Sequence, residues 1–563
     1  MTAVIDTLEV AFAALHAPGG LRDATVRGVD FAGQSLVDVV ATAVRFEACG
    51  FAGCDLGGAR LTDVVLRGCD LQTCRLSGAT LVGCDLSEAQ LRHARLARAT
   101  LTDTSLDDAA LYNANLADAR LTRVTARRAS PKLALFPGAS LVDVNLAEAD
   151  LEASQWRGAE LAGADLTSAR LAGASMEGAR LTGAVLRGAS LQGADLARAD
   201  LTGAVLEEAS LAGARLAGAV LSRVKGTRCS FEGAKIDGLV AEKSDFTGGR
   251  FVGVEGVGVS FAKAILEGTA WQGAKVPQGD FSGSSWAGSD LAGVDFTEGD
   301  FTGAKLGQCR LENATLERAQ LVDCDLGGSW LIHAHAQDST WTGATVAGAN
   351  LTAADFTGAD LDGLDLTGCR LRAAVFVRCS LQGASLAGMN LKEADCTDAD
   401  FRRANLAEAR FDEASLLRAD LRGAALAGAK LRAAKGRHAD FSGAVLDQAD
   451  LRGADLRETQ WEGARAHAAR FDVARLERAR MVGADLRGAF FEHARARYVD
   501  LSASDLAGTR WGGGDLRNAR LHRAKTELAD FGDADRSGAT GTDEGAARAE
   551  DFKPGQGAAT TEG

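Results

Sequence analysis

Histidine and cysteine are the residues of this chain that most readily bind metals or react as nucleophiles. The 563 residues include 11 cysteines and eight histidines. The one close histidine pair is His333 and His335 in "LIHAHAQDS", with Asp338 nearby. A His-x-His pair can bind a metal, but the sequence places no third ligand close to it. We therefore expect no metal site.

Motifs for nucleotide binding and catalysis are also missing from the sequence. No G-x-x-x-x-G-K-[ST] loop is present, and "WGGGDL" (511–516) does not resemble a phosphate-binding loop. Serine, histidine and aspartate are abundant, but no nucleophile has an identifiable base beside it. We expect no catalytic residue, no cofactor and no enzyme activity.

Charged side chains are the remaining chemical feature. The formal net charge is −14, which disfavours direct binding of nucleic acid. Residues 271–370 contain about 14 acids and about five bases, whereas 401–440 and 461–530 lean basic. The simpler interpretation of this segregation is a face kept soluble by mixed charge. The functional interpretation is a surface that docks charged partners or other rods. The candidate interaction residues are Asp280, Asp290, Asp295, Asp300, Asp325, Asp355, Asp360, Asp365, Arg465, Arg470, Arg475, Arg480, Arg495 and Arg497.

A five-residue repeat must position these side chains. From Leu21 to Phe531 an apolar residue recurs every five positions over about 103 pentads. We call this position i. Position i−2 is small and i−1 is mostly polar, as in "ADL" (164–166). On an extended chain i−2 and i point the same way, so both should face a core.

Because five is odd, a straight strand would turn alternate hydrophobes to solvent, so the chain must bend once per pentad. Glycine is frequent at i+2, where a turn needs positive φ. Aromatic residues at position i recur at intervals of 20, as in Phe471, Phe491, Trp511 and Phe531. This spacing predicts four pentads per coil and about 26 coils, a rod roughly 120 Å long.

The unit A-(D/N)-L-x-x, seen as "ADLTS" (164–168) and "ANLTA" (349–353), resembles the pentapeptide-repeat proteins. The resemblance covers residues 21–531. It implies an all-β fold, a right-handed quadrilateral parallel β-helix.

Segments that depart from the repeat are expected at three places. Residues 1–20 predict a short helical cap with Leu8, Ala11, Phe12 and Leu15 on one face. Residues 126–140 contain Pro131 and Pro137, which predict either a bulge or surface loop or a repaired coil edge. The resemblance makes a functional loop one reading of this segment. Residues 532–563 are polar and acidic and predict a disordered tail.

The apolar positions also contain unusual residues. Gly226, Gly256 and Gly436 occupy position i and should leave thin spots in the core. Ten cysteines lie at i−2 and Cys396 lies at i, so all 11 should be small buried hydrophobes. The pairs Cys49/Cys69 and Cys54/Cys74 are 20 residues apart and would stack at disulfide distance, but we expect free thiols.

These features predict a non-enzymatic protein-interaction scaffold whose partner and oligomeric state are open. No apolar run of about 18 residues and no basic leader is present, so we expect a cytoplasmic bacterial protein without a membrane span. The resemblance supplies two alternatives. One is a DNA mimic that protects DNA gyrase, although this chain has basic segments and lacks the C-terminal apolar helix of such proteins. The other is a component associated with a contractile or type VI secretion system.

Overall fold

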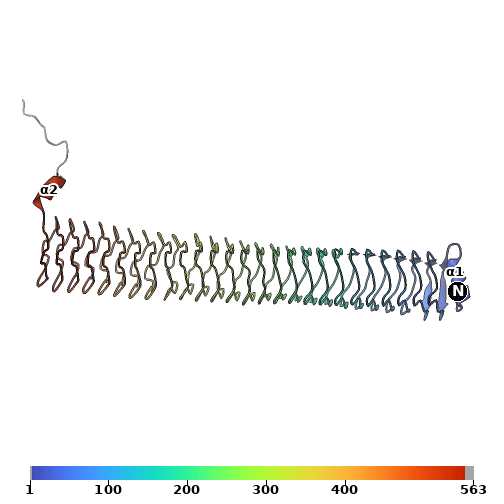
Figure 1. Cartoon of the computed structure of the whole chain (residues 1–563). Coiled ribbons are helices and arrows are strands. Elements are labelled where there is room, and N and C mark those ends of the chain that lie inside the picture. The colour runs from blue at the N-terminus through green and yellow to red at the C-terminus, as the bar shows by residue number, and fades with distance from the viewer. Residues whose placement is uncertain (1–2, 552–563) are drawn as a thin grey trace, which may run out of the picture. The chain divides into compact units, whose positions relative to one another are not determined.

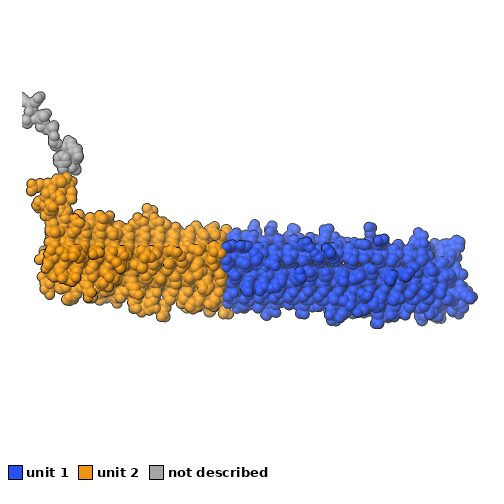
Figure 2. Space-filling model, viewed as in Figure 1, with its two compact units in different colours: residues 1–300 blue, residues 301–563 orange. Residues whose placement is uncertain are grey.

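The computed structural model describes residues 3–551. The chain forms two compact units, residues 1–300 and residues 301–563 (Figure 2). Each unit is a parallel β-solenoid, in which successive turns of the chain lie one on the next (Figure 1). The described residues contain two short helices and otherwise consist of strands, bridges and turns.

Unit 1 begins with the regular strands of the solenoid. Seven of them form one parallel sheet in the order β10-β9-β8-β7-β6-β4-β2, and β1, β3 and β5 form a second parallel sheet. Paired residues are 20 apart within the larger sheet, as in Leu61↔Leu81 and Leu81↔Leu101. The strands are β1 (Ala3–Ile5), β2 (Leu21–Arg22), β3 (Ala24–Arg27), β4 (Val40–Thr42), β5 (Arg45–Glu47), β6 (Arg60–Thr62), β7 (Thr80–Val82), β8 (Thr100–Thr102), β9 (Arg120–Thr122) and β10 (Ser140–Val142).

Beyond β10 the pairing continues as single parallel bridges, one in each pentad. Asp165 pairs with Val185 in unit 1, and Asp325 pairs with Thr345 in unit 2. The bridges remain single because the chain turns after every short extended segment. A turn of the solenoid therefore takes 20 residues, or four pentads, as the aromatic spacing predicted.

A tight turn in each pentad keeps successive apolar residues on the inside, although the repeat has an odd number of residues. The carbonyl oxygen of Leu161 accepts a hydrogen bond from the N–H of Ala164 at 3.0 Å, and Gly163 between them has φ 68°. The equivalent Ser168 has φ 57°, so side chains other than glycine also adopt this left-handed conformation here. Each turn brings the next apolar residue back to the inside.

The core consists of the residues at i and i−2, as predicted. Leu191, Leu196, Leu201 and Leu206 are fully buried, and so are the alanines two residues before the last three of them, Ala194, Ala199 and Ala204. Aromatic rings 20 residues apart stack on consecutive turns. The ring centroids of Phe136 and Trp156 are 3.8 Å apart, and those of Phe471 and Phe491 are 4.7 Å apart, with nearly parallel planes.

Helix α1 (Leu8–His16) lies at the N-terminal end of unit 1 (Figure 1). It buries Ala11 and Leu15, whereas Leu8, which was expected on the same buried face, is exposed. Strand β1 precedes the helix and pairs with β3, an element that the sequence pattern did not indicate because it lies outside the pentad register.

No bulge or surface loop interrupts residues 126–140, so that alternative is wrong. Leu135 pairs with Asn115 and Gln155 as in a regular turn of the solenoid. Pro131 has no N–H and cannot donate to Asp150, yet the N–H of Asp150 still donates to Ala129 at 2.9 Å. Pro137 occupies the second position of a turn, where no donor is needed. This segment is the repaired coil edge.

Two of the three glycines at position i are not thin spots, because neighbouring groups occupy the space. A Cβ atom at Gly226 would lie 2.7 Å from the ring of Phe246, and one at Gly256 would lie 2.6 Å from the Ile236 backbone. At Gly436 the nearest atom is a Leu456 methyl group at 3.2 Å, which leaves more room.

The C-terminal segment departs from the expected tail, because regular structure continues past residue 531. Asp515 pairs with Asp535 and Arg520 pairs with Thr540. Helix α2 (Glu544–Asp551) follows, and a guanidinium nitrogen of Arg523 donates to the carbonyl oxygen of Ala547 at 2.6 Å. The rest of the predicted tail, residues 552–563, lies outside the described residues.

Candidate functional site

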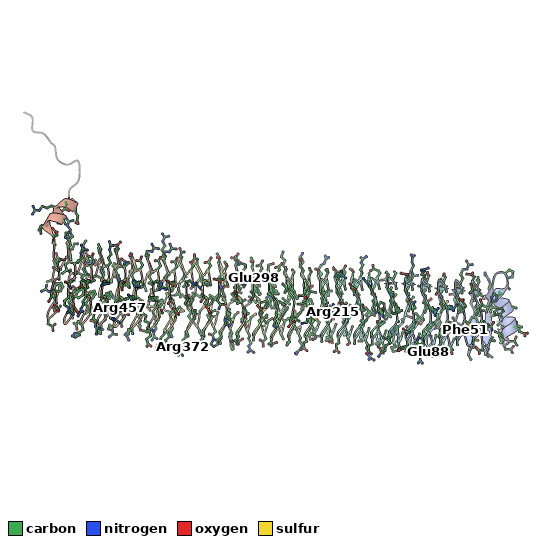
Figure 3. The ribbon with its side chains drawn as sticks, in the orientation of Figure 1. Phe51, Glu88, Arg215, Glu298, Arg372 and Arg457 are labelled. Atoms are coloured by element: carbon green, nitrogen blue, oxygen red, sulfur yellow. The ribbon has the colours of Figure 1, made fainter. Side chains whose placement is uncertain are left out.

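The accessible side chains of both units are those at i−1, i+1 and i+2. Outward side chains 20 residues apart lie side by side, so each unit presents four ladders. In unit 2 we name the four faces after one outward residue each: the Asp355, Asp360, Asp365 and Arg370 faces. Figure 3 labels Arg372 and Arg457 of unit 2 among these outward side chains.

The acidic candidate residues do not gather on one face. In unit 1, Asp280 and Asp300 are bridge partners, but Asp290 pairs with Ala270 and Asp295 pairs with Lys275 on other faces. In unit 2, Asp355 and Asp360 define different faces, and Asp325 lies with Asp365 on a third. The charge asymmetry along the sequence therefore does not become a single acidic patch in either unit.

Outward aspartates also have a structural role in the turn that follows them. The carboxylate of Asp355 accepts hydrogen bonds from the N–H and hydroxyl of Thr357 at 2.9 and 2.6 Å. The same pair of bonds from Thr367 lowers the pKa of Asp365. Such Asx-turn contacts explain why aspartate is frequent at i−1 without any reference to a partner.

Most of the basic candidate residues are already paired with carboxylates. The closest ion pairs join Arg465 to Asp447 (2.8 Å), Arg470 to Asp472 (2.9 Å), Arg480 to Glu462 (2.7 Å) and Arg497 to Asp515 (2.5 Å). Arg475 is 3.7 Å from Asp455, and Arg495 has no ion pair among residues 3–551. Arg475 and Arg495 are bridge partners on the Asp355 face, and Arg497 follows on the same turn.

A short motif that the sequence reasoning missed organises the charge of unit 2. In Asp-Leu-Arg or Asp-Phe-Arg, the arginine at i+1 folds back on the aspartate at i−1. The pairs are Asp400–Arg402, Asp420–Arg422, Asp450–Arg452, Asp455–Arg457, Asp485–Arg487 and Asp515–Arg517, at 2.5–2.8 Å. The signal in the sequence is an aspartate and an arginine on either side of the buried residue.

These pairs hold several carboxylates firmly in the charged form. Partial burial raises the pKa of Asp450, but hydrogen bonds from Arg452 and Arg432 lower it more, to about 2. The hydrogen bond from Arg487, with a further one from His467, lowers the pKa of Asp485 to about 2. Each pair joins the side chains at i−1 and i+1 of one pentad. The ion pair therefore holds both charged groups in fixed positions on the outside of the solenoid.

All 11 cysteines are buried free thiols. Burial raises the pKa of Cys69, Cys84 and Cys369 to about 11. The hydrogen bond between Cys54 and Cys74 raises the pKa of Cys74 and lowers that of Cys54. The thiol of Cys54 also donates to the carbonyl oxygen of Phe31 at 2.7 Å. These thiols pack as small hydrophobes.

His333 and His335 lie on the outside of unit 2 and both are exposed. Within residues 3–551, no three histidine, cysteine, aspartate or glutamate side chains converge as metal ligands. Within the same range, neither helix is long and apolar enough to cross a membrane.

Comparison with known families gives a clear match. The family model described as pentapeptide repeats matches residues 45–123, 145–238, 280–338 and 342–510, more than half of the chain. No curated protein sequence matches significantly.

Three solved structures are similar to parts of the chain. A pentapeptide repeat protein of the Arabidopsis thaliana thylakoid lumen is 33% identical over 17% of this chain and 68% of its own (TM-score 0.17). HetL, a pentapeptide repeat protein involved in heterocyst differentiation regulation in the cyanobacterium Nostoc, is 27% identical over 45% and 88% (0.15). QnrB1, a plasmid-mediated fluoroquinolone resistance protein, is 20% identical over 40% and 91% (0.24). With TM-scores this low, these superpositions support no inference about function.

Proposed function

Because the chain belongs to the pentapeptide-repeat family, we propose that it is a non-enzymatic scaffold that binds protein partners through its outward faces. The supporting observation is the arrangement of charge. Ladders of outward side chains stand on a hydrogen-bonded backbone, and many of the charged groups are fixed by ion pairs. Rigid side chains lose little conformational entropy on binding, which favours recognition over catalysis by mobile groups.

The finer geometry of the scaffold is part of this proposal. The family implies a right-handed coil of square cross-section, and the pentad register implies about 26 coils. With turns about 4.8 Å apart, such a solenoid would be about 120 Å long. Small-angle X-ray scattering of the whole chain measures this length, and a maximum dimension near half that value would contradict it.

Affinity capture from a bacterial lysate tests the binding function. The bait is the full chain, compared with a variant in which Asp280, Asp290, Asp295 and Asp300 are replaced by asparagine. Asparagine keeps the turn-capping oxygen and removes only the charge. We expect a cytoplasmic protein that the wild-type chain retains and the variant releases.

A matched control replaces four other outward aspartates of unit 1, Asp150, Asp165, Asp195 and Asp200, by asparagine. This control carries the same net charge as the test variant, so it should retain the partner. If both variants lose the same proteins, the binding depends on net charge alone. A specific interaction through the 280–300 acids is then excluded.

The two narrower assignments have less support. A DNA mimic needs a continuous row of unneutralised carboxylates, whereas the aspartates of unit 2 are spread over several faces and many pair with arginine. Association with a secretion system would rest on family analogy alone. Scaffolding through protein contacts is the function that the charge ladders favour.

A further inference from the structure

The outward side chains of the Asp355 face change sign along unit 2. The face comprises the outward residues of nine consecutive turns, from His335 to Tyr498. Its first four turns contain Asp338, Asp355, Asp395 and Asp398, with Arg378 and His335 as the basic positions. The last four turns contain eight basic positions and three acids. The basic positions are Lys435, Arg437, His438, Arg457, Arg475, Arg478, Arg495 and Arg497, and the acids are Asp455, Glu458 and Glu477.

Several of these charges make no ion pair among the described residues, although some of the aspartates accept hydrogen bonds within their own turn. Among residues 3–551, Asp338, Asp355 and Asp395 make no ion pair, and neither do Lys435 and Arg495. Apolar side chains lie among these charges, because Val375 and Val377 on the third turn and Leu417 on the fifth are partly exposed. A surface whose two halves carry opposite charge, with apolar side chains between the charges, is suited to docking against a charged partner.

Three pairs of opposite charge meet when the face is placed against a copy of itself. Consider a two-fold axis that runs parallel to the strands and passes through the turn of Ser415 and Leu417. This axis places each turn of one copy opposite the turn of the other copy that lies equally far on the other side of Ser415. Positions along the strand do not change, so residues at i−1 in one copy face residues at i−1 in the other. Asp395 then faces Lys435, Asp355 faces Arg475, and Arg378 faces Glu458.

The turn on the axis is compatible with this arrangement. Leu417 meets its own copy there, which buries apolar surface. Arg418 also meets its copy, but its guanidinium is held by two hydrogen bonds to Asp398, each 2.6 Å long. That pairing neutralises the like charges at the axis. We propose that unit 2 associates with a second copy of this chain, antiparallel, through the Asp355 face.

The dimensions indicate a weak and salt-sensitive dimer. Nine turns about 4.8 Å apart give a contact about 40 Å long, and a three-residue strand is about 10 Å wide. Two such surfaces bury about 800–1,000 Å², which is at the low end for specific association. We expect a dissociation constant in the micromolar range at about 50 mM salt, and at least tenfold weaker association at about 500 mM. The inference extends the proposed function by naming the partner of one face.

Sedimentation velocity and light scattering on the full chain test this dimer. Asp395→Lys would place a lysine against Lys435, and Lys435→Glu would place a glutamate against Asp395. Because the contact occurs twice in a two-fold dimer, each substitution introduces two repulsions. We expect each variant alone to dissociate at least tenfold more readily than the wild-type chain.

An equimolar mixture of the two variants is the decisive measurement. In the mixed dimer, the lysine at 395 of one copy faces the glutamate at 435 of the other, and the second contact is the native pair. The mixture should therefore dimerise at concentrations at which each variant alone is mostly monomeric. If Asp395→Lys lowers the melting temperature by removing the turn cap at Thr397, Asp395→Asn keeps the cap and should weaken the dimer less.

Matched controls are available on other faces of unit 2. Lys430 lies on the Arg370 face, and Asp365 lies on the Asp365 face. The variants Lys430→Glu and Asp365→Lys should both dimerise like the wild-type chain. A chain that stays monomeric at about 100 µM and low salt would overturn the proposal. So would a dimer that both variants leave intact, or a mixture that remains monomeric. The capture experiment concerns acids of unit 1, so the two proposals can fail separately.

Discussion

At the scale of single residues, the buried side of each pentad and its outward side follow different physical rules. Position i must fill a narrow interior, and Leu196 is fully buried there. Positions i−1 and i+1 are free to vary. An aspartate at i−1, however, accepts a hydrogen bond from the N–H two residues later, as Asp195 does from Ala197 at 3.1 Å. The same residue type can thus be structural in one pentad and an interaction group in another.

Replacing Leu196 by aspartate should open the solenoid locally. The carboxylate would enter an interior without a partner, which costs several kcal/mol in addition to the lost apolar contacts. We expect a loss of about 4 kcal/mol or more and faster amide exchange in the adjacent turns, measured by thermal melting and hydrogen exchange. Gln192→Asp, at an exposed position one pentad away, is the control. Unchanged melting of Leu196→Asp would mean that position i does not face the core.

Asp450 should contribute to stability in a pH-dependent way. Its folded-state pKa is about 2, below the unfolded value of about 3.9. A depressed pKa stabilises the folded chain above pH about 4, and this contribution disappears as the pH falls towards 2. Asp450→Asn should therefore cost about 1–2 kcal/mol at pH 7. Urea unfolding at pH 7 and at pH 2.5 measures the difference.

The test is the difference in stability between the wild-type chain and Asp450→Asn at two pH values. At pH 2.5 the wild-type chain and Asp450→Asn should be closer in stability than at pH 7, because the wild-type carboxylate is then partly protonated. Asp338→Asn, which removes an exposed carboxylate without an ion pair, should change stability little at either pH. A constant difference between wild type and Asp450→Asn at both values would show that the ion pairs with Arg432 and Arg452 do not stabilise the fold.

At the scale of elements, the two glycines Gly226 and Gly436 occupy the same position of the pentad but should respond differently to substitution. An added Cβ at Gly226 would lie 2.7 Å from the Phe246 ring, so Gly226→Ala should destabilise by about 1–3 kcal/mol. At Gly436 the nearest group is a flexible leucine methyl at 3.2 Å. Gly436→Ala should be neutral or stabilise by up to about 1 kcal/mol. Thermal melting compares them, and equal losses would mean that Phe246 does not occupy the Gly226 space.

The pentad register predicted the turns, the buried positions and the 20-residue pairing, because each depends on residues close in the sequence. It failed at Gly226, where the Phe246 ring of the next turn occupies the space that was expected to be empty. For residues 126–140 it left a bulge and a repaired coil edge both open, and the coil continues because Asp150 still donates its N–H to Ala129. Strand β1 escaped prediction because it pairs with β3 from outside the register.

The candidate site was predicted less well, for a geometric reason. A charge count along the sequence averages over the four faces, so neighbouring acids such as Asp355, Asp360 and Asp365 point in different directions. Ion pairs are also invisible to such a count. The Asp-Leu-Arg pairs could have been found from the sequence once i−1 and i+1 were seen to lie on the same outward side.

At the scale of the whole molecule, the net charge of −14 is a poor guide to what any one surface presents. On the Asp360 face of unit 2, Asp400, Asp420 and Asp440 form a ladder that resembles a row of phosphates. Arg402 and Arg422 stand within this ladder, and Arg422 lies 2.5 Å from Asp420. The row is therefore largely neutralised, and a protein that binds DNA through its phosphates would find little attraction there.

We therefore expect that the purified chain does not compete with DNA for DNA gyrase at micromolar concentration. A supercoiling assay with increasing protein measures this directly. Replacing Arg402, Arg403 and Arg422 by glutamine would expose the ladder while preserving the fold, since these side chains lie outside the core. If that variant competes and the wild-type chain does not, the arginines are what distinguish this chain from a DNA mimic. Competition by the wild-type chain itself would instead restore the gyrase assignment, because the carboxylates would then act despite their pairing.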